Sequence, residues 1–245
     1  MTGFFAGARF FLRGYELIRQ RGLRRYAAIP LLINVVIFVA LTIVGANQFE
    51  QLMQWLLPEG QGWWIEVLRA VLWIMFAAIV VVAFYFLFTL VANLVASPFN
   101  GLLADKVQIS LGSVPPDGRN WLSVIRGFPA ALVSESRKLA YFLLIGVILV
   151  LISLVPAVNL AGIVLWPLAT AWMLTLEYVA YPMESCEHDF RSIRARARAN
   201  RMMALGFGLT CLLFTIIPLI NLFVIPAAVA GASAMWAESW SRNSG

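Results

Sequence analysis

The sequence predicts an all-α integral membrane protein, and its composition and charge pattern are the reasons. Of 245 residues, 62% are hydrophobic and only 12% are charged, whereas soluble domains carry about 25% charged residues. The 18 Lys and Arg residues outnumber the 12 Asp and Glu residues, and they cluster outside the apolar runs. Such clustering is typical of membrane topology and argues against nucleic acid as a partner.

We expect one membrane domain over residues 1–245, because no stretch has the composition of a separate soluble domain. Residues 1–26 predict an amphipathic helix that either lies in the plane of the lipid headgroups or packs on the protein's own helices. The segments expected after it are a first span (27–46), an outer loop (47–66), a second span (67–96), a cytoplasmic segment (97–138), a first hairpin (139–178), a basic cytoplasmic segment (179–202), a second hairpin (203–236) and a tail (237–245).

The distribution of basic residues predicts the orientation of the chain. Residues 1–26 contain six arginines, and the loop 47–66 contains no Lys or Arg. Cytoplasmic segments carry the excess of Lys and Arg in multi-pass proteins, so we expect both termini in the cytoplasm. The first span should insert as an uncleaved anchor, since the apolar run is too long for a signal peptide.

A sequence motif that occurs twice, here called the repeated phrase, predicts the two hairpins. Residues 155–160 (Val-Pro-Ala-Val-Asn-Leu) recur as 217–222 (Ile-Pro-Leu-Ile-Asn-Leu), each inside a long apolar stretch. The arms 140–155 and 203–217 hold 16 and 15 residues, roughly 22–24 Å of helix against an apolar core of about 30 Å. This favours hairpins that enter from the cytoplasm and turn inside the bilayer. The alternative is two complete spans joined by a tight outer turn.

Asn159 and Asn221 belong to this repeated phrase and are candidate pathway residues. An Asn at this position caps the returning helix, and the positive end of that helix would then attract an anion at membrane depth. The alternative is that Pro and Asn merely make a tight turn.

A double arginine directly before the first span is the best candidate anion site. In Gly22-Leu23-Arg24-Arg25, two guanidinium groups could hold a tetrahedral oxyanion, helped by backbone N–H groups at a helix start. The alternative interpretation is that arginines flanking a first span only set topology.

Two further sites complete the candidates. Ser97-Pro98-Phe99-Asn100-Gly101 is expected to end the second span, because Pro98 cannot continue helical hydrogen bonding. Glu177, at the cytoplasmic end of the first hairpin, is a candidate proton carrier or a partner for an arginine, and an interfacial salt bridge is the favoured role.

The motifs of nucleotide and cofactor enzymes are missing from the sequence. It contains no Walker loop, dinucleotide fingerprint, Gly-x-Ser-x-Gly elbow or acidic Asp-x-x-Asp metal cluster. We therefore expect no cofactor, no metal and no enzymatic activity, which weakens the interpretation as an enzyme acting on lipid headgroups.

Three regions of the chain, in order, resemble the bacterial sulfate transporter CysZ family. They are 22–25 with 29–34, 97–104, and 217–222 with 226–232 and 235–236. The resemblance implies an oligomeric inner-membrane protein, surrounded by lipids, that moves sulfate ions into the cytoplasm for cysteine synthesis. It also implies two long spanning helices plus two hairpins that partly penetrate the bilayer.

The resemblance assigns sulfate binding to Gly22, Leu23, Arg24 and Arg25, and it places the 97–101 motif near the pathway. The chain departs from the family at Ala180, where an Asp is common, and at 184–186, where Glu-Ser-Cys replaces Asp-Asn-His. No role carries over to those positions. The expected function is sulfate uptake as a channel or a proton-coupled permease, and the alternative is a non-transporting membrane scaffold or assembly factor.

Overall fold

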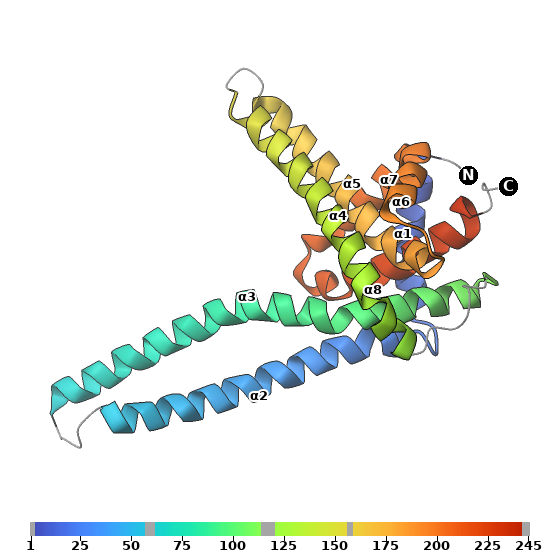
Figure 1. Cartoon of the computed structure of the whole chain (residues 1–245). Helices are drawn as coiled ribbons and strands as arrows, with labels where there is room; N and C mark the ends of the chain where they lie inside the picture. Colours follow the sequence, from blue (N-terminus) through green and yellow to red (C-terminus); the bar gives the residue numbers. More distant parts are fainter. Residues whose placement is uncertain (1–2, 57–61, 114–120, 156–158, 242–245) are drawn as a thin grey trace. The chain divides into compact units, whose positions relative to one another are not determined.

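The computed structural model describes residues 3–56, 62–113, 121–155 and 159–241; side chains are not described at 27, 31, 34, 56, 83–98, 121–134 and 218–219. Within these ranges all regular structure is helical (Figure 1). In chain order the helices are α1 (Phe4–Ile18), α2 (Arg24–Leu56), α3 (Trp63–Ser110), α4 (Trp121–Ser153), α5 (Asn159–Ser185), α6 (Phe190–Ala199), α7 (Arg201–Thr215), α8 (Pro218–Met235) and the π-helical turn η1 (Trp236–Trp240).

Among the described residues, five helical stretches are long and apolar enough to cross a membrane. They are Arg24–Trp55, Trp63–Val82, Glu135–Ser153, Asn159–Ser185 and Ile220–Trp240. The first two bury under a tenth of their most apolar window, whereas the last buries 67% of it. Long, exposed apolar helices are stable only in contact with lipid or with another chain, so the predicted class of multi-pass α-helical membrane protein is confirmed.

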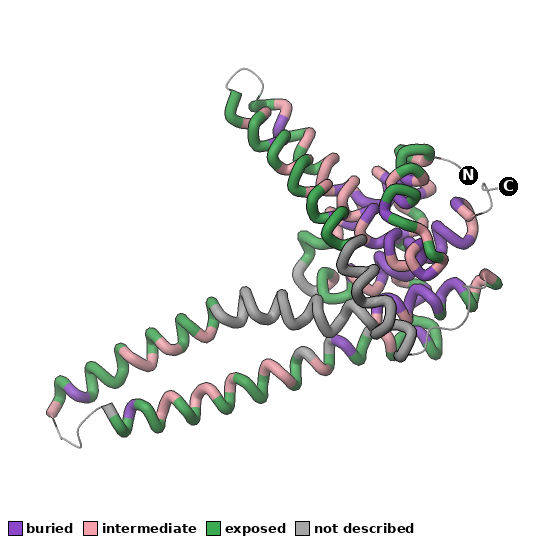
Figure 2. Tube along the Cα trace, viewed as in Figure 1, coloured by how far each residue is buried: buried purple, intermediate pink, exposed green. Residues whose placement is uncertain are grey.

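The chain divides into two compact units, residues 28–97 and residues 1–27 with 98–245. The 28–97 unit contains most of α2 and of α3, which contact each other through aromatic side chains. Phe49 stacks on Phe76 with ring centroids 4.2 Å apart and meets Trp73 edge-on at 4.9 Å. Much of this unit is exposed (Figure 2), as expected for helices that face lipid.

In the larger unit, α1 packs tightly against α7 and α8. A Cβ added to Gly7 would overlap the carbonyl oxygen of Met203, and one added to Gly206 would overlap the carbonyl oxygen of Phe4. Gly14 is enclosed in the same way by the backbone of α8 at Ala227. Helices that approach this closely need glycine at the contact, because any side chain would hold the backbones apart.

The contacts of α1 decide between the two interpretations of the amphipathic N-terminal segment. Phe11, Leu17 and Ile18 are buried in the core that α7 and α8 share. Phe11 meets the rings of Phe207 and Phe214 edge-on. The apolar face of α1 therefore packs on the protein's own helices, and the helix ends at Ile18 rather than near residue 26.

Two expectations about helix ends are corrected by the structure. Most of the predicted outer loop 47–66 is helical, because α2 continues to Leu56 and α3 already begins at Trp63. The lack of Lys and Arg in this segment indicates membrane topology and does not mark the end of a helix. Buried Met53 and the ring of Phe49 hold this part of α2 in place.

The second correction concerns Pro98, which does not end its helix. α3 continues through Ser97-Pro98-Phe99-Asn100-Gly101 to Ser110. A proline in a helix interior removes one hydrogen bond and costs about 3 kcal/mol. Beyond it, Leu103, Ala104 and Val107 are fully buried in the core of the larger unit. Burying side chains as large as those of Leu103 and Val107 contributes about 1.5–3 kcal/mol each. Together they outweigh the cost of the proline.

The helices of the first predicted hairpin are longer than the sequence argument assumed. α4 and α5 have 33 and 27 residues, and a 27-residue helix rises roughly 40 Å. The apolar stretch of α4 is only Glu135–Ser153, 19 residues, so the length of the whole helix does not decide between a hairpin and two complete spans. At α7, 15 residues rise only about 22 Å.

Candidate functional site

The double-arginine motif lies where the chain turns from α1 into α2. Gly22 has a φ of +101°, a conformation that side chains other than glycine rarely adopt. Leu23 is 6% exposed and belongs to the hydrophobic core. Arg24 and Arg25 follow as the first two residues of α2, and both are exposed. A buried leucine thus anchors the turn, and the two guanidinium groups face outward from it.

The local electrostatics at this turn favour an anion. The first turn of α2 contains no acidic residue, so two arginines lie at the positive end of a 33-residue helix dipole without an acidic side chain in that turn. The guanidinium of Arg25 lies 5.1 Å from the ring centroid of Tyr26. The backbone N–H groups of Arg24 and Tyr26 donate to the carbonyls of Gln20 and Leu23. We therefore expect the backbone N–H groups to contribute less to anion binding than predicted. The two guanidinium groups contribute most.

A second polar site surrounds Lys138 in the larger unit. Its Nζ lies 2.7 Å from Oε2 of Glu177 on α5 and 2.8 Å from Oε2 of Glu135, one turn earlier on α4. The Lys138 side chain is only 6% exposed, against 34% for Glu177 and 49% for Glu135. A buried ammonium is stable only when it is paired. The salt bridge predicted for Glu177 is present, with a lysine rather than an arginine as its partner.

Asn100 joins this polar site through Tyr181. The Tyr181 phenol lies close enough to the Asn100 amide to interact with it, and close enough to Glu177 and Lys138 to interact with their charges. Asn100 itself is 5% exposed. We name Asn100, Glu135, Lys138, Glu177 and Tyr181 the Lys138 cluster. It brings together α3, α4 and α5, and it unites two candidates that lie 77 residues apart in the sequence, Asn100 and Glu177.

The other residues of the 97–101 motif differ in how far the structure describes them. The side chains of Ser97 and Pro98 lie outside the described residues. Phe99 is half-buried and Gly101 is buried. Of this motif, Asn100 is the residue that the structure places in a polar site.

The structure contradicts the capping role predicted for Asn221, whereas that of Asn159 stays a prediction. α8 begins at Pro218, so Ile217 is the capping residue, and the Asn221 N–H donates to the Ile217 carbonyl at 2.8 Å inside the helix. Asn221 is therefore not a helix cap, because Pro218 is already suited to the first helical position. Asn159 is the first residue of α5 and donates to the Val155 carbonyl. Both asparagines are exposed; residues 156–158 of the phrase lie outside the description.

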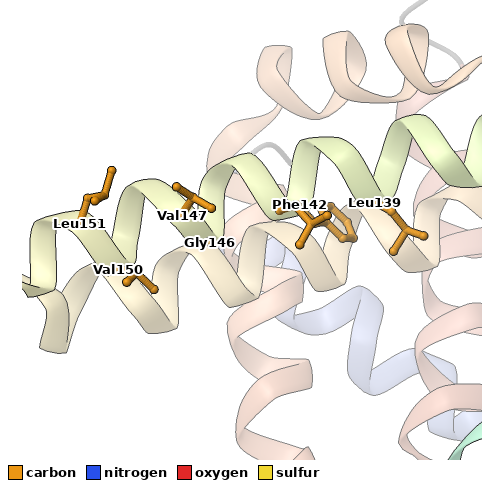
Figure 3. A pocket seen from close by; sticks show the side chains of 7 residues that line it. Leu139, Phe142, Gly146, Val147, Val150 and Leu151 are labelled. Atoms are coloured by element: carbon orange, nitrogen blue, oxygen red, sulfur yellow. The ribbon is translucent and has the colours of Figure 1, made fainter.

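A groove along α4 is a poor site for an anion. Its walls are almost wholly apolar, and Figure 3 shows the side chains that project from α4 on either side of Gly146. The lining residues are Leu139, Phe142, Leu143, Gly146, Val147, Val150 and Leu151. Such a surface suits lipid chains or another helix rather than a hydrated ion.

Sequence reasoning missed Lys138 and Tyr181. Two patterns could have indicated them: Glu135 and Lys138 are three residues apart at the start of an apolar run, and Glu177 and Tyr181 are four apart on one helix. Neither pattern shows that α4 and α5 bring the two pairs together. In the part of the chain that the structure describes, no three His, Cys, Asp or Glu side chains are grouped so as to hold a metal ion.

The fold and the two sites define a multi-pass α-helical membrane protein with an exposed cationic turn and a buried ion-pair cluster. Comparison with known sequences gives the family. The family described as "Sulfate transporter CysZ/Etoposide-induced protein 2.4" matches residues 10–226, and the chain belongs to it. The family resemblance seen in the sequence motifs is thereby confirmed.

Several bacterial relatives cover nearly the whole chain. The proteins named "Sulfate transporter CysZ" from Pseudomonas aeruginosa (strain LESB58) and Salmonella typhimurium (strain LT2) are 36% and 35% identical, over 234 and 241 residues. These matches cover 94% and 96% of this chain and 94% and 93% of the relatives. The relative of that name from Pseudomonas fluorescens (strain Pf0-1) is 34% identical over 94% of this chain and 92% of its own.

Proposed function

We propose that this protein carries sulfate across the bacterial inner membrane into the cytoplasm and so supplies sulfur for cysteine biosynthesis. Its family and the names of its relatives support sulfate as the transported ion. Transport proceeds as channel-like conduction or as proton-coupled permeation. Membership of a transporter family also argues against an enzyme.

The observation that carries the proposal is the exposed arginine pair at the start of α2. Sulfate is a tetrahedral dianion, and guanidinium groups donate paired hydrogen bonds to such an ion. Gly22 makes the turn, Leu23 anchors it, and Arg24 and Arg25 bind the ion at the cytoplasmic end of the helix. Because both arginines are exposed, binding stays weak enough for release, which conduction requires.

Apart from the two arginines, the proposed pathway residues are uncharged, except for Glu177, which forms an ion pair with Lys138. In the 97–101 motif, Ser97, Pro98, Phe99 and Gly101 shape the backbone around Asn100, whose amide offers a neutral contact. Asn159 and Asn221 offer further amides at the tips of the two helix pairs. Glu177 is the titratable group available for coupling to protons.

The arrangement in the membrane follows the exposed apolar surfaces. α2 and α3 cross the bilayer, and the α4–α5 and α7–α8 pairs enter from the cytoplasm and turn within it. Exposed apolar side chains at both tips support this, among them Leu154, Leu160, Ile216 and Leu222. Both termini are cytoplasmic, and copies of the chain assemble as a homo-oligomer within the lipid.

Radiolabelled sulfate uptake into proteoliposomes tests the proposal. We expect the native protein to take up sulfate and the variant Arg24→Gln/Arg25→Gln to lose about tenfold or more in apparent affinity, because two sets of charge-assisted hydrogen bonds are removed. The matched control is Arg19→Gln/Arg21→Gln, which removes the same charge from exposed positions just before Gly22.

The control separates binding from topology. If the arginines only set orientation, both double variants reduce uptake equally and in proportion to misinserted protein. If the native protein neither binds nor transports sulfate, the transporter interpretation fails and the scaffold alternative takes its place.

A further inference from the structure

The charges of the Lys138 cluster are arranged so that solvent reaches the carboxylates and not the ammonium. The Lys138 side chain is 6% exposed, whereas those of Glu177 and Glu135 are 34% and 49% exposed. Both carboxylates contact Nζ, at 2.7 and 2.8 Å. An anion that approaches this site therefore meets negative charge before it meets the lysine.

The net charge of the ionised cluster opposes an anion. Two carboxylates and one ammonium sum to one negative charge, and at short range in a partly buried site this repels a dianion strongly. One proton on Glu177 makes the cluster neutral. It also weakens one of the two ion pairs that cover Lys138, because a protonated carboxyl group is no longer a charged partner.

The neighbours of Glu177 are suited to an oxyanion once its charge is gone. Tyr181 lies one turn after Glu177 on α5, Lys138 and Glu135 belong to α4, and Asn100 joins from α3 beside Tyr181, whereas Tyr178 is buried and interacts with Cys211 on α7. The Lys138 ammonium, the Tyr181 phenol O–H and the Asn100 amide N–H are all hydrogen-bond donors. Only Glu135 remains as an acidic group among these neighbours, and half of its side chain lies in solvent.

We propose that Lys138 contacts sulfate within the pathway and that Glu177 is its displaceable counter-ion. A proton from solvent binds the Glu177 carboxylate, the carboxyl group releases Nζ, and Nζ then donates to a sulfate oxygen. When sulfate leaves, Glu177 gives up the proton and the Lys138–Glu177 ion pair forms again. This inference rests on the proposed sulfate transport and assigns to it a proton-linked step at a particular pair of residues.

Sulfate uptake into proteoliposomes over a pH series tests the pair. We expect native uptake to rise as the pH falls and Glu177→Gln to show a flat profile at the native low-pH level, because the amide has the carboxyl group's shape without its charge. Lys138→Met should reduce uptake about tenfold at every pH, since it removes a charged donor to the ion. The control Glu16→Gln neutralises an exposed carboxylate on α1 and should keep the native profile.

The double variant Lys138→Met/Glu177→Met separates transport from folding. Replacing a buried ion pair by apolar side chains of similar size is often neutral for stability, so this variant should melt like the native protein and still transport as poorly as Lys138→Met. Native-level uptake by the double variant would show that the pair only joins α4 to α5, and it would overturn the inference.

The remaining outcomes are distinguishable. If native uptake is robust but Glu177→Gln follows the native pH profile, the inference falls and the proposed transport stands. If the native protein takes up no sulfate at any pH, both fall together.

Discussion

Arg13 on α1 and Glu238 in the π-helical turn η1 form an ion pair, with 2.5 Å between Nη1 and Oε2. They lie 225 residues apart in the chain. The pair therefore connects the first helix to the last turn. In the same turn, the indole N–H of Trp240 points to the sulfur of Met203 on α7, at 3.3 Å. These contacts hold η1 against the helices that surround α1.

We expect the Arg13–Glu238 pair to contribute modestly to stability. Its side chains are 38% and 28% exposed, and pairs of this kind contribute about 0.2–1 kcal/mol. A double-mutant cycle of Arg13→Gln and Glu238→Gln, followed by denaturant unfolding, measures the coupling energy. The coupling should shrink in high salt because exposed charges are screened. A coupling of zero at low salt would show that the contact is not stabilising.

The close approach of α1 to α7 predicts a large effect from a small substitution. Gly7→Ala should destabilise the protein by about 1–3 kcal/mol, because the new Cβ overlaps the Met203 carbonyl and the helices must move apart. Gly146→Ala on α4 is the matched control, since its Cβ would have no heavy atom within 4 Å. That change should be neutral or stabilise the helix by up to about 1 kcal/mol. Equal melting temperatures for the two variants would contradict the packing described for α1.

The left-handed turn at Gly22 predicts a link between backbone strain and sulfate binding. Gly22→Ala should lower the free energy of unfolding by about 1–2 kcal/mol through backbone strain. Steric overlap adds nothing, because the new Cβ would have no heavy atom within 4 Å. It should also weaken sulfate binding by displacing Arg24 and Arg25. Gly112 has a φ of +75° and equally open surroundings. Gly112→Ala should therefore lose similar stability while its sulfate affinity, measured by calorimetry, stays native.

The N-terminus of α6 predicts a pH-dependent local stability. The Ser192 hydroxyl and backbone N–H donate to Asp189 at 2.5 and 2.9 Å, and they lower the pKa of its carboxyl. Because the folded-state pKa lies below the unfolded one, the carboxylate stabilises α6 above about pH 4. This stabilisation is lost as the pH falls through the lower folded-state pKa. Hydrogen exchange of α6 amides over an acidic pH series measures it.

Asp189→Asn provides the control for α6. Asparagine caps helices as well as aspartate does but does not titrate. Protection of α6 in this variant should no longer change with pH over that range. If the variant keeps the native pH dependence, Asp189 is not the titrating group.

The sites were predictable to different degrees. Arg24, Arg25 and Gly22 form one continuous motif, so the sequence indicated them directly, and their role in binding stays a prediction. Glu177 was recognised because an acidic residue beside an apolar run is unusual. Lys138 was not, because a lysine at the edge of such a run looks like a topology signal until its two carboxylate partners are seen.

The sequence by itself determined the class of this protein, the presence of long apolar helices and the family. These follow from composition, the lengths of apolar runs and continuous motifs, which are local properties of the chain. Only the tertiary structure decided that α3 continues past Pro98, that Asn221 is no helix cap, and that Glu177 pairs with Lys138. The first and the third depend on contacts between segments far apart in sequence, and the energy of those contacts overrides the local preference of a proline. The second depends on where α8 begins, at Pro218.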